Sequence, residues 1–143
     1  MSRISETDLQ HLIDTQLPWV RAMGMSVQAI QEGSCRVRLP HRDEHLRPGG
    51  TISGPAMMGL ADYAMYVGVL SAIGRVELAV TTNLSINFLR RPQPAAILAD
   101  CRMIKVGRRL AYGEVFLYAE GAEDDGPVAH VTSTYSIPPD RDG

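Results

Sequence analysis

Apolar and polar residues recur along this chain with two different periods, and the change of period predicts its elements. The N-terminal residues repeat at helical spacing behind a Ser-x-x-Asp capping pattern, which predicts an amphipathic helix over residues 5–23, bent at Pro18. Later segments alternate with a period of two, which is typical of strands. The predicted strands cover residues 25–31, 34–39, 80–88, 96–106, 110–118 and 128–137.

The clearest alternation lies in the predicted strand over residues 80–88. Its even positions carry mostly apolar side chains and its odd positions carry only polar ones, which predicts one face toward a core and one toward solvent. The residues expected to share the apolar face are Val80, Thr82, Leu84, Ile86 and Phe88.

A long apolar stretch from Gly54 to Gly74 contains a single charged residue, Asp62. Its length is close to the roughly 20 residues that span a bilayer, but a central aspartate costs about 3 kcal/mol there. A helix buried on all sides within a soluble domain is therefore the better interpretation. Such a helix needs a wide apolar surface, which predicts an α+β fold with a curved antiparallel sheet wrapped around it.

Length and composition narrow the class of protein. The 143 residues suit one domain, with a body over residues 25–137 and a frayed tail over residues 138–143. The net charge of −2 gives no reason to expect binding to nucleic acid or membranes. The first six residues lack the apolar stretch of a secretory signal, so a cytoplasmic protein is expected. Cys35 and Cys101 show no metal-ligand spacing and are expected to be reduced and packed as small apolar residues.

Asp62 is the main candidate for chemistry because its neighbours in the helix are apolar. A buried carboxylate must find partners or stay protonated. One interpretation is a carboxylate that ties two elements together. The other is a general base or nucleophile tuned by its apolar surroundings.

The glycine-rich segment before the helix, residues 49–55, supplies a second candidate site. Free N–H groups at a helix N-terminus can hold a developing oxyanion. Gly54 lies eight residues before Asp62, so the two are about 12 Å apart along one helix. A second helix running antiparallel would bring its own Gly54 beside Asp62, which hints at a site built between subunits.

The segment 54–62, Gly-Pro-Ala-Met-Met-Gly-Leu-Ala-Asp, resembles the helix start of hot-dog thioesterases of the phenylacetate-degradation (PaaI-like) type. The segment 81–92 resembles the following strand of that family, and Gly107-Arg108 also fits. The resemblance covers residues 20–137 through the order and spacing of its elements.

This resemblance implies hydrolysis of acyl-CoA thioesters by a homodimer, often a dimer of dimers, with substrate bound at the subunit interface. It implies that Asp62 is the catalytic carboxylate, that the Gly54 N–H is the oxyanion donor and that Thr81 orients the attacking water. It implies no metal and no redox cofactor. Thr81 also suits a plain β-branched strand position.

The chain departs from the family pattern at two places. The family often has His-Gly-Gly where this chain has Ser53-Gly54-Pro55, and Pro55 lacks an N–H. The family often has an asparagine where this chain has Arg47, which is expected to bind a carboxylate of the acyl group or a CoA phosphate.

Other candidates have two interpretations each. Arg90, Arg91 and Arg108 lie at strand ends that a curved sheet is expected to bring together, either as a mouth for CoA phosphates or as ordinary surface charge. Tyr63 and Tyr66 flank Asp62 and either line an acyl pocket or pack in the core. The four histidines show no ligand spacing and are expected at the surface.

Two other functions remain open from the sequence. A hot-dog dehydratase or hydratase acting on acyl chains would need a catalytic histidine, and the loop before the apolar helix offers only His45 nearby. A non-catalytic module that binds acyl-CoA or lipid would keep its ligand without turnover. The nature of the acyl group is not set by the sequence.

Overall fold

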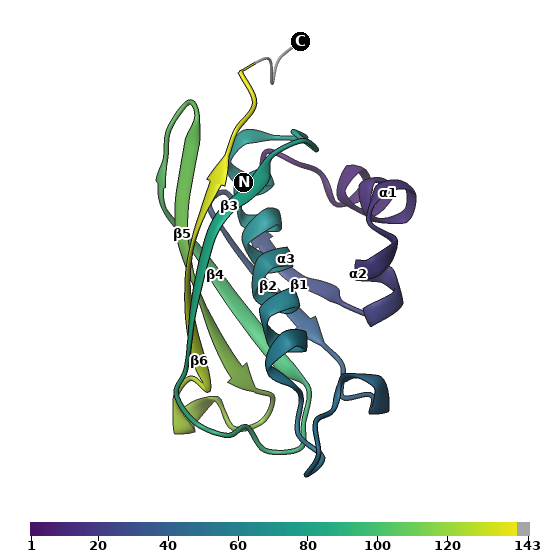
Figure 1. Cartoon of the computed structure of the whole chain (residues 1–143). Coiled ribbons are helices and arrows are strands. Elements are labelled where there is room, and N and C mark those ends of the chain that lie inside the picture. The colour runs from purple at the N-terminus through teal and green to yellow at the C-terminus, as the bar shows by residue number, and fades with distance from the viewer. Residues whose placement is uncertain (140–143) are drawn as a thin grey trace.

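The long apolar helix lies along the concave face of a curved sheet in the computed structural model, which describes residues 1–139 (Figure 1). The elements in chain order are α1 (Glu6–Gln16), α2 (Pro18–Met23), β1 (Ser26–Gln31), β2 (Ser34–Leu39), α3 (Gly54–Ile73), β3 (Val80–Phe88), β4 (Ile97–Val106), β5 (Leu110–Ala119) and β6 (Ala129–Ser136). Short 3-10 helices lie at Asp43–His45 and Glu123–Asp125. Residues 140–143 of the predicted frayed tail lie outside the described residues.

All strand pairs are antiparallel, and the six strands follow the order β1-β2-β4-β5-β6-β3. Strands β1 and β3 therefore form the two edges. Helix α3 is long and apolar enough to cross a membrane, but 72% of an 18-residue apolar stretch within it is buried inside the molecule. This arrangement confirms the predicted α+β hot-dog fold, with a curved sheet around one apolar helix.

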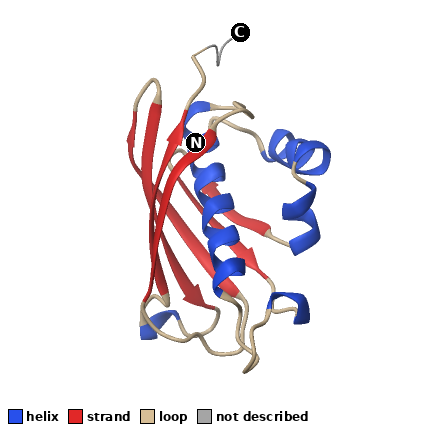
Figure 2. Cartoon of the chain, viewed as in Figure 1, coloured by secondary structure: helices blue, strands red, loops and turns tan. Residues whose placement is uncertain are grey.

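The N-terminal segment forms two helices where the sequence predicts one bent helix. Ser5 caps α1 by accepting a hydrogen bond from the Asp8 N–H, as the capping pattern predicts. Leu17 then leaves the helical conformation, and Pro18 begins α2. Because proline has no N–H and fixes φ, it suits the first turn of a new helix better than the interior of a continuous one. Figure 2 shows both short helices on the same side of the sheet as α3.

Strand β3 differs from the predicted alternation because it contains a β-bulge. Thr81 pairs with Tyr135 and Asn83 pairs with Thr134, so Thr82 is an extra residue. The bulge shifts the phase of the strand. Val80 is 57% exposed and Thr81 turns toward α3, whereas Leu84 and Ile86 pack against the core. Thr82 is also exposed, so the prediction that Val80 and Thr82 share a face with Leu84 and Ile86 is wrong.

The two cysteines, distant in the chain, lie directly opposite each other on β2 and β4. Both are free and buried, as expected for small packed residues. The neighbouring Cys101 thiol and burial raise the pKa of the Cys35 thiol, which keeps it protonated.

Candidate active site

Asp62 sits on α3 beneath the start of β3 and the end of β6. Its Oδ1 accepts a hydrogen bond of 2.7 Å from the Thr81 hydroxyl. The Tyr135 hydroxyl lies 2.9 Å from the same oxygen and 3.1 Å from the Asp62 carbonyl oxygen. Among the described residues, no donor contacts Oδ2. One carboxylate oxygen is thus held in place while the other is left available.

The donors around Asp62 keep their protons. Burial, followed by the charge of Asp62, raises the pKa of Tyr135 well above its ordinary value. Hydroxyl donors stabilise a carboxylate and fix its orientation. The local structure therefore orients Asp62 for use as a base or a nucleophile. The same contacts would also serve a carboxylate that joins α3 to the sheet.

Asp62 opens into a cavity of about 180 Å³. Tyr135 and two other tyrosines, Tyr63 and Tyr66, form much of its wall. Burial also raises the pKa of Tyr63 above its ordinary value and the pKa of Tyr66 to about 12. Tyr63 packs edge-on against Trp19 of α2 with ring centroids 6.3 Å apart. The full lining is Leu17, Trp19, Asp62, Tyr63, Tyr66, Ala79, Val80, Thr81 and Tyr135. We call this space the Asp62 cavity.

A second and larger cavity, of about 440 Å³, lies at the N-terminus of α3. The Ser53 side chain caps the helix by accepting from the Ala56 N–H, and Pro55 occupies the first turn. A Cβ at Gly54 would lie 3.3 Å from Phe88 Cζ, so glycine allows this close approach. The lining is Arg47, Thr51, Ile52, Gly54, Met57, Phe88, Leu89, Arg90, Arg91 and Pro92. We call this space the Gly54 cavity.

The structure brings several of the predicted site residues together and separates others. Arg47, Arg90 and Arg91 line the Gly54 cavity, whereas Tyr63, Tyr66 and Thr81 line the Asp62 cavity. Ser53 acts as a helix cap. Arg108 borders a different cavity near the C-terminal end of α3, because the β4–β5 turn lies at the opposite end of the sheet from Phe88. The predicted closeness of Arg108 to Arg90 and Arg91 is wrong within one protomer.

Three residues occupy positions that the sequence alone does not indicate. Tyr135 and Trp19 reach the Asp62 cavity from elements far away in the chain. His45 is buried rather than exposed, and its Nε2 lies 2.9 Å from the Met23 carbonyl oxygen. Tyr135 has one sequence clue: it follows Val131 and Ser133 on the same face of a strand, and a buried tyrosine usually needs a hydrogen-bond partner.

The two cavities share no lining residue. Gly54 and Asp62 lie on one straight helix, about 12 Å apart by its rise. A single thioester carbonyl cannot contact both within one protomer. Each protomer therefore carries two separate halves of the predicted site.

Comparisons with a family model, with solved structures and with curated proteins all point to the same family. The family model of the thioesterase superfamily matches residues 49–124. A solved structure from Silicibacter sp. TM1040, named as a candidate thioesterase, is 41% identical, with a TM-score of 0.86 over 97% of this chain and 95% of that chain.

The phenylacetic acid degradation protein PaaI of Thermus thermophilus, solved as a mutant, is 25% identical. Its TM-score is 0.72 over 85% of this chain and 99% of that chain. A candidate esterase of Thermoplasma acidophilum is 27% identical over 97 residues, which are 68% of this chain and 73% of that protein. These relatives support a hydrolase and, in general, hydrolysis of thioesters. The chain belongs to the thioesterase superfamily, within its PaaI-like hot-dog group.

Proposed function

We propose that this protein is a cytoplasmic homodimer that hydrolyses acyl-CoA thioesters to free acids and CoA. The proposed active site joins Asp62 of one protomer to the partner's Gly54. The observation that carries this proposal is the oriented carboxylate: Asp62 is held through Oδ1 by two hydroxyl donors and opens into a largely apolar cavity.

The edge strand β3 supports the proposed dimer. Within residues 1–139, no strand pairs with its outer edge. Strand β3 exposes large apolar side chains at both ends, with Val80 at 57% and Phe88 at 49%. An exposed edge of this kind is suited to pairing with another strand. The Asp62 cavity lies at the start of β3, and the Gly54 cavity lies at its end.

A two-fold axis would pair β3 with its copy in antiparallel fashion. The start of each strand then lies beside the end of the other. This places each Asp62 cavity next to the Gly54 cavity of the partner, so two complete sites form per dimer. Association of two such dimers into a tetramer stays a prediction.

The proposed chemistry follows from these positions. The thioester carbonyl oxygen accepts a hydrogen bond from the Gly54 N–H, which lies at the positive end of the α3 dipole. Asp62 takes a proton from a water molecule, whose oxygen bonds to the carbonyl carbon. The tetrahedral intermediate then collapses, the C–S bond breaks, and the CoA thiolate leaves and takes up a proton. In the nucleophilic variant, an Asp62 carboxylate oxygen bonds to the carbonyl carbon, the C–S bond breaks, and the CoA thiolate leaves and takes up a proton. Water then adds to the resulting mixed anhydride, which releases the free acid and restores the Asp62 carboxylate.

Thr81 has a different role in this scheme from the one that the family resemblance implies. Its hydroxyl donates to Asp62 Oδ1. We therefore assign it the orientation of the carboxylate, which in turn orients the attacking water. Arg47, Arg90 and Arg91 give the Gly54 cavity a positive rim suited to the CoA phosphates.

The competing functions have less support. A dehydratase would need a histidine at the reacting carbon, but the ring of His45 is buried against Met23 and lines neither cavity. A binding module needs no oriented carboxylate. It would predict that Asp62→Asn keeps ligand binding and that the wild type shows no turnover.

Free-thiol release from a panel of acyl-CoAs tests the proposal. The panel should span acetyl, butyryl, octanoyl, dodecanoyl and phenylacetyl groups. We expect turnover by the wild type and a loss of about 100-fold or more in Asp62→Asn. Asp124→Asn, which alters an exposed carboxylate in the short 3-10 helix before β6, is the matched control and should keep full activity. Activity of Asp62→Asn within a few-fold of wild type would overturn the mechanism.

A further inference from the structure

The N-terminal helices reach into the Asp62 cavity. Leu17, at the junction of α1 and α2, and Trp19, in α2, both line it, although neither belongs to the sheet or to α3. Trp19 lies over Gly59 of α3, where a Cβ would be 3.7 Å from Trp19 Cζ3. Trp19 is 41% exposed, so it contacts both the cavity and solvent.

The cavity that Trp19 lines is small within one protomer. Its volume of about 180 Å³ is well below the roughly 300–1,000 Å³ of sites for drug-sized ligands. Its walls are mostly aromatic and aliphatic, and the polar atoms of Asp62 and Thr81 lie together at the position of the proposed reaction. A ligand group entering from the reacting carbon therefore meets an apolar chamber with Trp19 as one of its walls.

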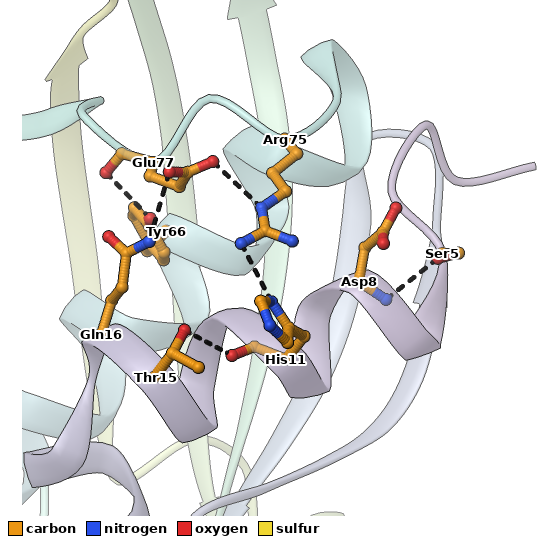
Figure 3. A network of polar contacts seen from close by, with 8 residues as sticks. All are labelled: Ser5, Asp8, His11, Thr15, Gln16, Tyr66, Arg75 and Glu77. Atoms are coloured by element: carbon orange, nitrogen blue, oxygen red, sulfur yellow. Dashed lines mark hydrogen bonds and ion pairs between the residues drawn. The ribbon is translucent and has the colours of Figure 1, made fainter.

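Polar contacts join α1, the helix that leads to Leu17, to the loop after α3, as Figure 3 shows. Gln16 at the end of α1 donates to Glu77 in the loop after α3 (3.3 Å), and Arg75 joins Glu77 (3.0 Å) to His11 of α1 (3.2 Å). The Tyr66 hydroxyl donates to the Glu77 carbonyl oxygen (3.0 Å). Glu77 therefore links the helix that leads to Leu17 with a tyrosine of the cavity and with the chain entering β3.

We propose that Trp19 is the specificity-determining residue of the acyl site, and that it restricts the protein to compact apolar acyl groups by blocking longer chains. This proposal rests on the proposed function, because it takes the Asp62 cavity as the acyl end of the site. It predicts that the side chain at position 19 changes which acyl group is accepted without changing the chemistry at Asp62.

The kinetic test compares butyryl-CoA with dodecanoyl-CoA in the wild type, Trp19→Ala and Trp19→Phe. In an apolar pocket, each methylene group changes kcat/KM between substrates by about 10-fold or more. Trp19→Ala, which removes the ring, should therefore raise the dodecanoyl-to-butyryl ratio of kcat/KM by at least about tenfold. Trp19→Phe keeps a ring, so its dodecanoyl-to-butyryl ratio of kcat/KM should stay within a few-fold of the wild-type ratio. An unchanged ratio in Trp19→Ala would overturn the proposal. If thermal unfolding shows that this variant does not fold, Trp19→Leu provides the same comparison.

A binding test separates this proposal from the proposed function. Trp19 is the only tryptophan of the chain, so its fluorescence reports directly on the cavity. The probes are the non-hydrolysable thioethers S-butyl-CoA and S-dodecyl-CoA. A saturable emission change with tighter binding of the butyl probe supports the proposal even if the wild type hydrolyses nothing. No emission change with either probe, or tighter binding of the dodecyl probe, contradicts it.

Discussion

The Tyr135 hydroxyl lies 2.9 Å from Asp62 Oδ1, although 73 residues separate the two in the chain. Thr81 donates to the same oxygen at 2.7 Å. Strands β3 and β6, which pair with each other, thus hold one carboxylate of the helix that they cover. This arrangement fixes Asp62 relative to the edge strand at which we place the dimer.

Tyr135→Phe should lower the free energy of unfolding by about 1–2 kcal/mol, because a carboxylate facing the core loses a hydrogen-bond donor. The looser orientation of Asp62 should also lower kcat/KM by about tenfold, since the base is no longer held in place. Chemical denaturation and thiol release measure the two effects.

Tyr63→Phe is the matched control for stability. Tyr63 is also buried, but its hydroxyl has no hydrogen-bond partner among the described residues. Because an unpartnered buried hydroxyl contributes no hydrogen bond, its loss should not lower the free energy of unfolding. Equal destabilisation by the two substitutions would show that the Tyr135–Asp62 contact contributes nothing specific.

The arginines at the Gly54 cavity should act on binding rather than on chemistry. Replacing Arg47, Arg90 and Arg91 together by glutamine should raise KM for acyl-CoA about tenfold and leave kcat nearly unchanged, because charge-assisted contacts to phosphate are lost. Steady-state kinetics at low salt measure this effect. Arg108→Gln, at the opposite end of the sheet, should have a smaller effect. A larger KM effect from Arg108→Gln than from the triple variant would move the CoA phosphates away from the Gly54 cavity.

The cavity tyrosines predict a loss of stability at alkaline pH. Burial raises the pKa of Tyr66 to about 12, above the value of about 10 in the unfolded chain. The contribution of Tyr66 to the free energy of unfolding is therefore fully present below about pH 10 and is lost as the pH rises toward about 12. Tyr66→Phe should make the fall in unfolding free energy shallower across this range.

Urea unfolding at a series of pH values measures that slope. Tyr112→Phe, which alters a tyrosine that is 40% exposed, is the control and should leave it unchanged. Identical slopes for wild type and Tyr66→Phe would refute the assignment.

The sequence predicts the main helices and strands well, because these elements depend on strong local patterns of apolar and polar residues. One charge within a long apolar stretch identifies α3 and its candidate residue, and the glycine-rich segment before it marks where the helix begins. The family resemblance adds the hot-dog fold, which the structure and the comparisons confirm.

The details that the sequence does not predict depend on contacts between distant segments. The bulge at Thr82 reverses the face of Val80, and no local pattern encodes it. Tyr135 and Trp19 reach Asp62 only through the folded sheet and the N-terminal helices. Arg108 lies far from Arg90 because the β4–β5 turn is at the end of the sheet where β3 begins, whereas Arg90 follows the end of β3.

The central claim is that Asp62 of one protomer works with the partner's Gly54, and mixed dimers test it directly. Asp62→Asn removes the base, and Gly54→Pro removes the N–H. The extended backbone of Ser53, with φ −72° and ψ 158°, is compatible with a following proline. The proline Cβ would lie 3.3 Å from Phe88 Cζ, so the Phe88 ring, on a side chain that is 49% exposed, has to shift by a few tenths of an ångström to admit it. Each variant alone should lose about 100-fold or more of the thiol-release activity.

The two variants are then mixed in equal amounts, and subunit exchange is verified by native mass spectrometry with distinguishable tags. Mixed dimers would carry one intact site and one doubly altered site, so random exchange should restore about a quarter of the wild-type activity. No recovery despite verified exchange would show that the two groups do not meet between subunits, and would contradict the account.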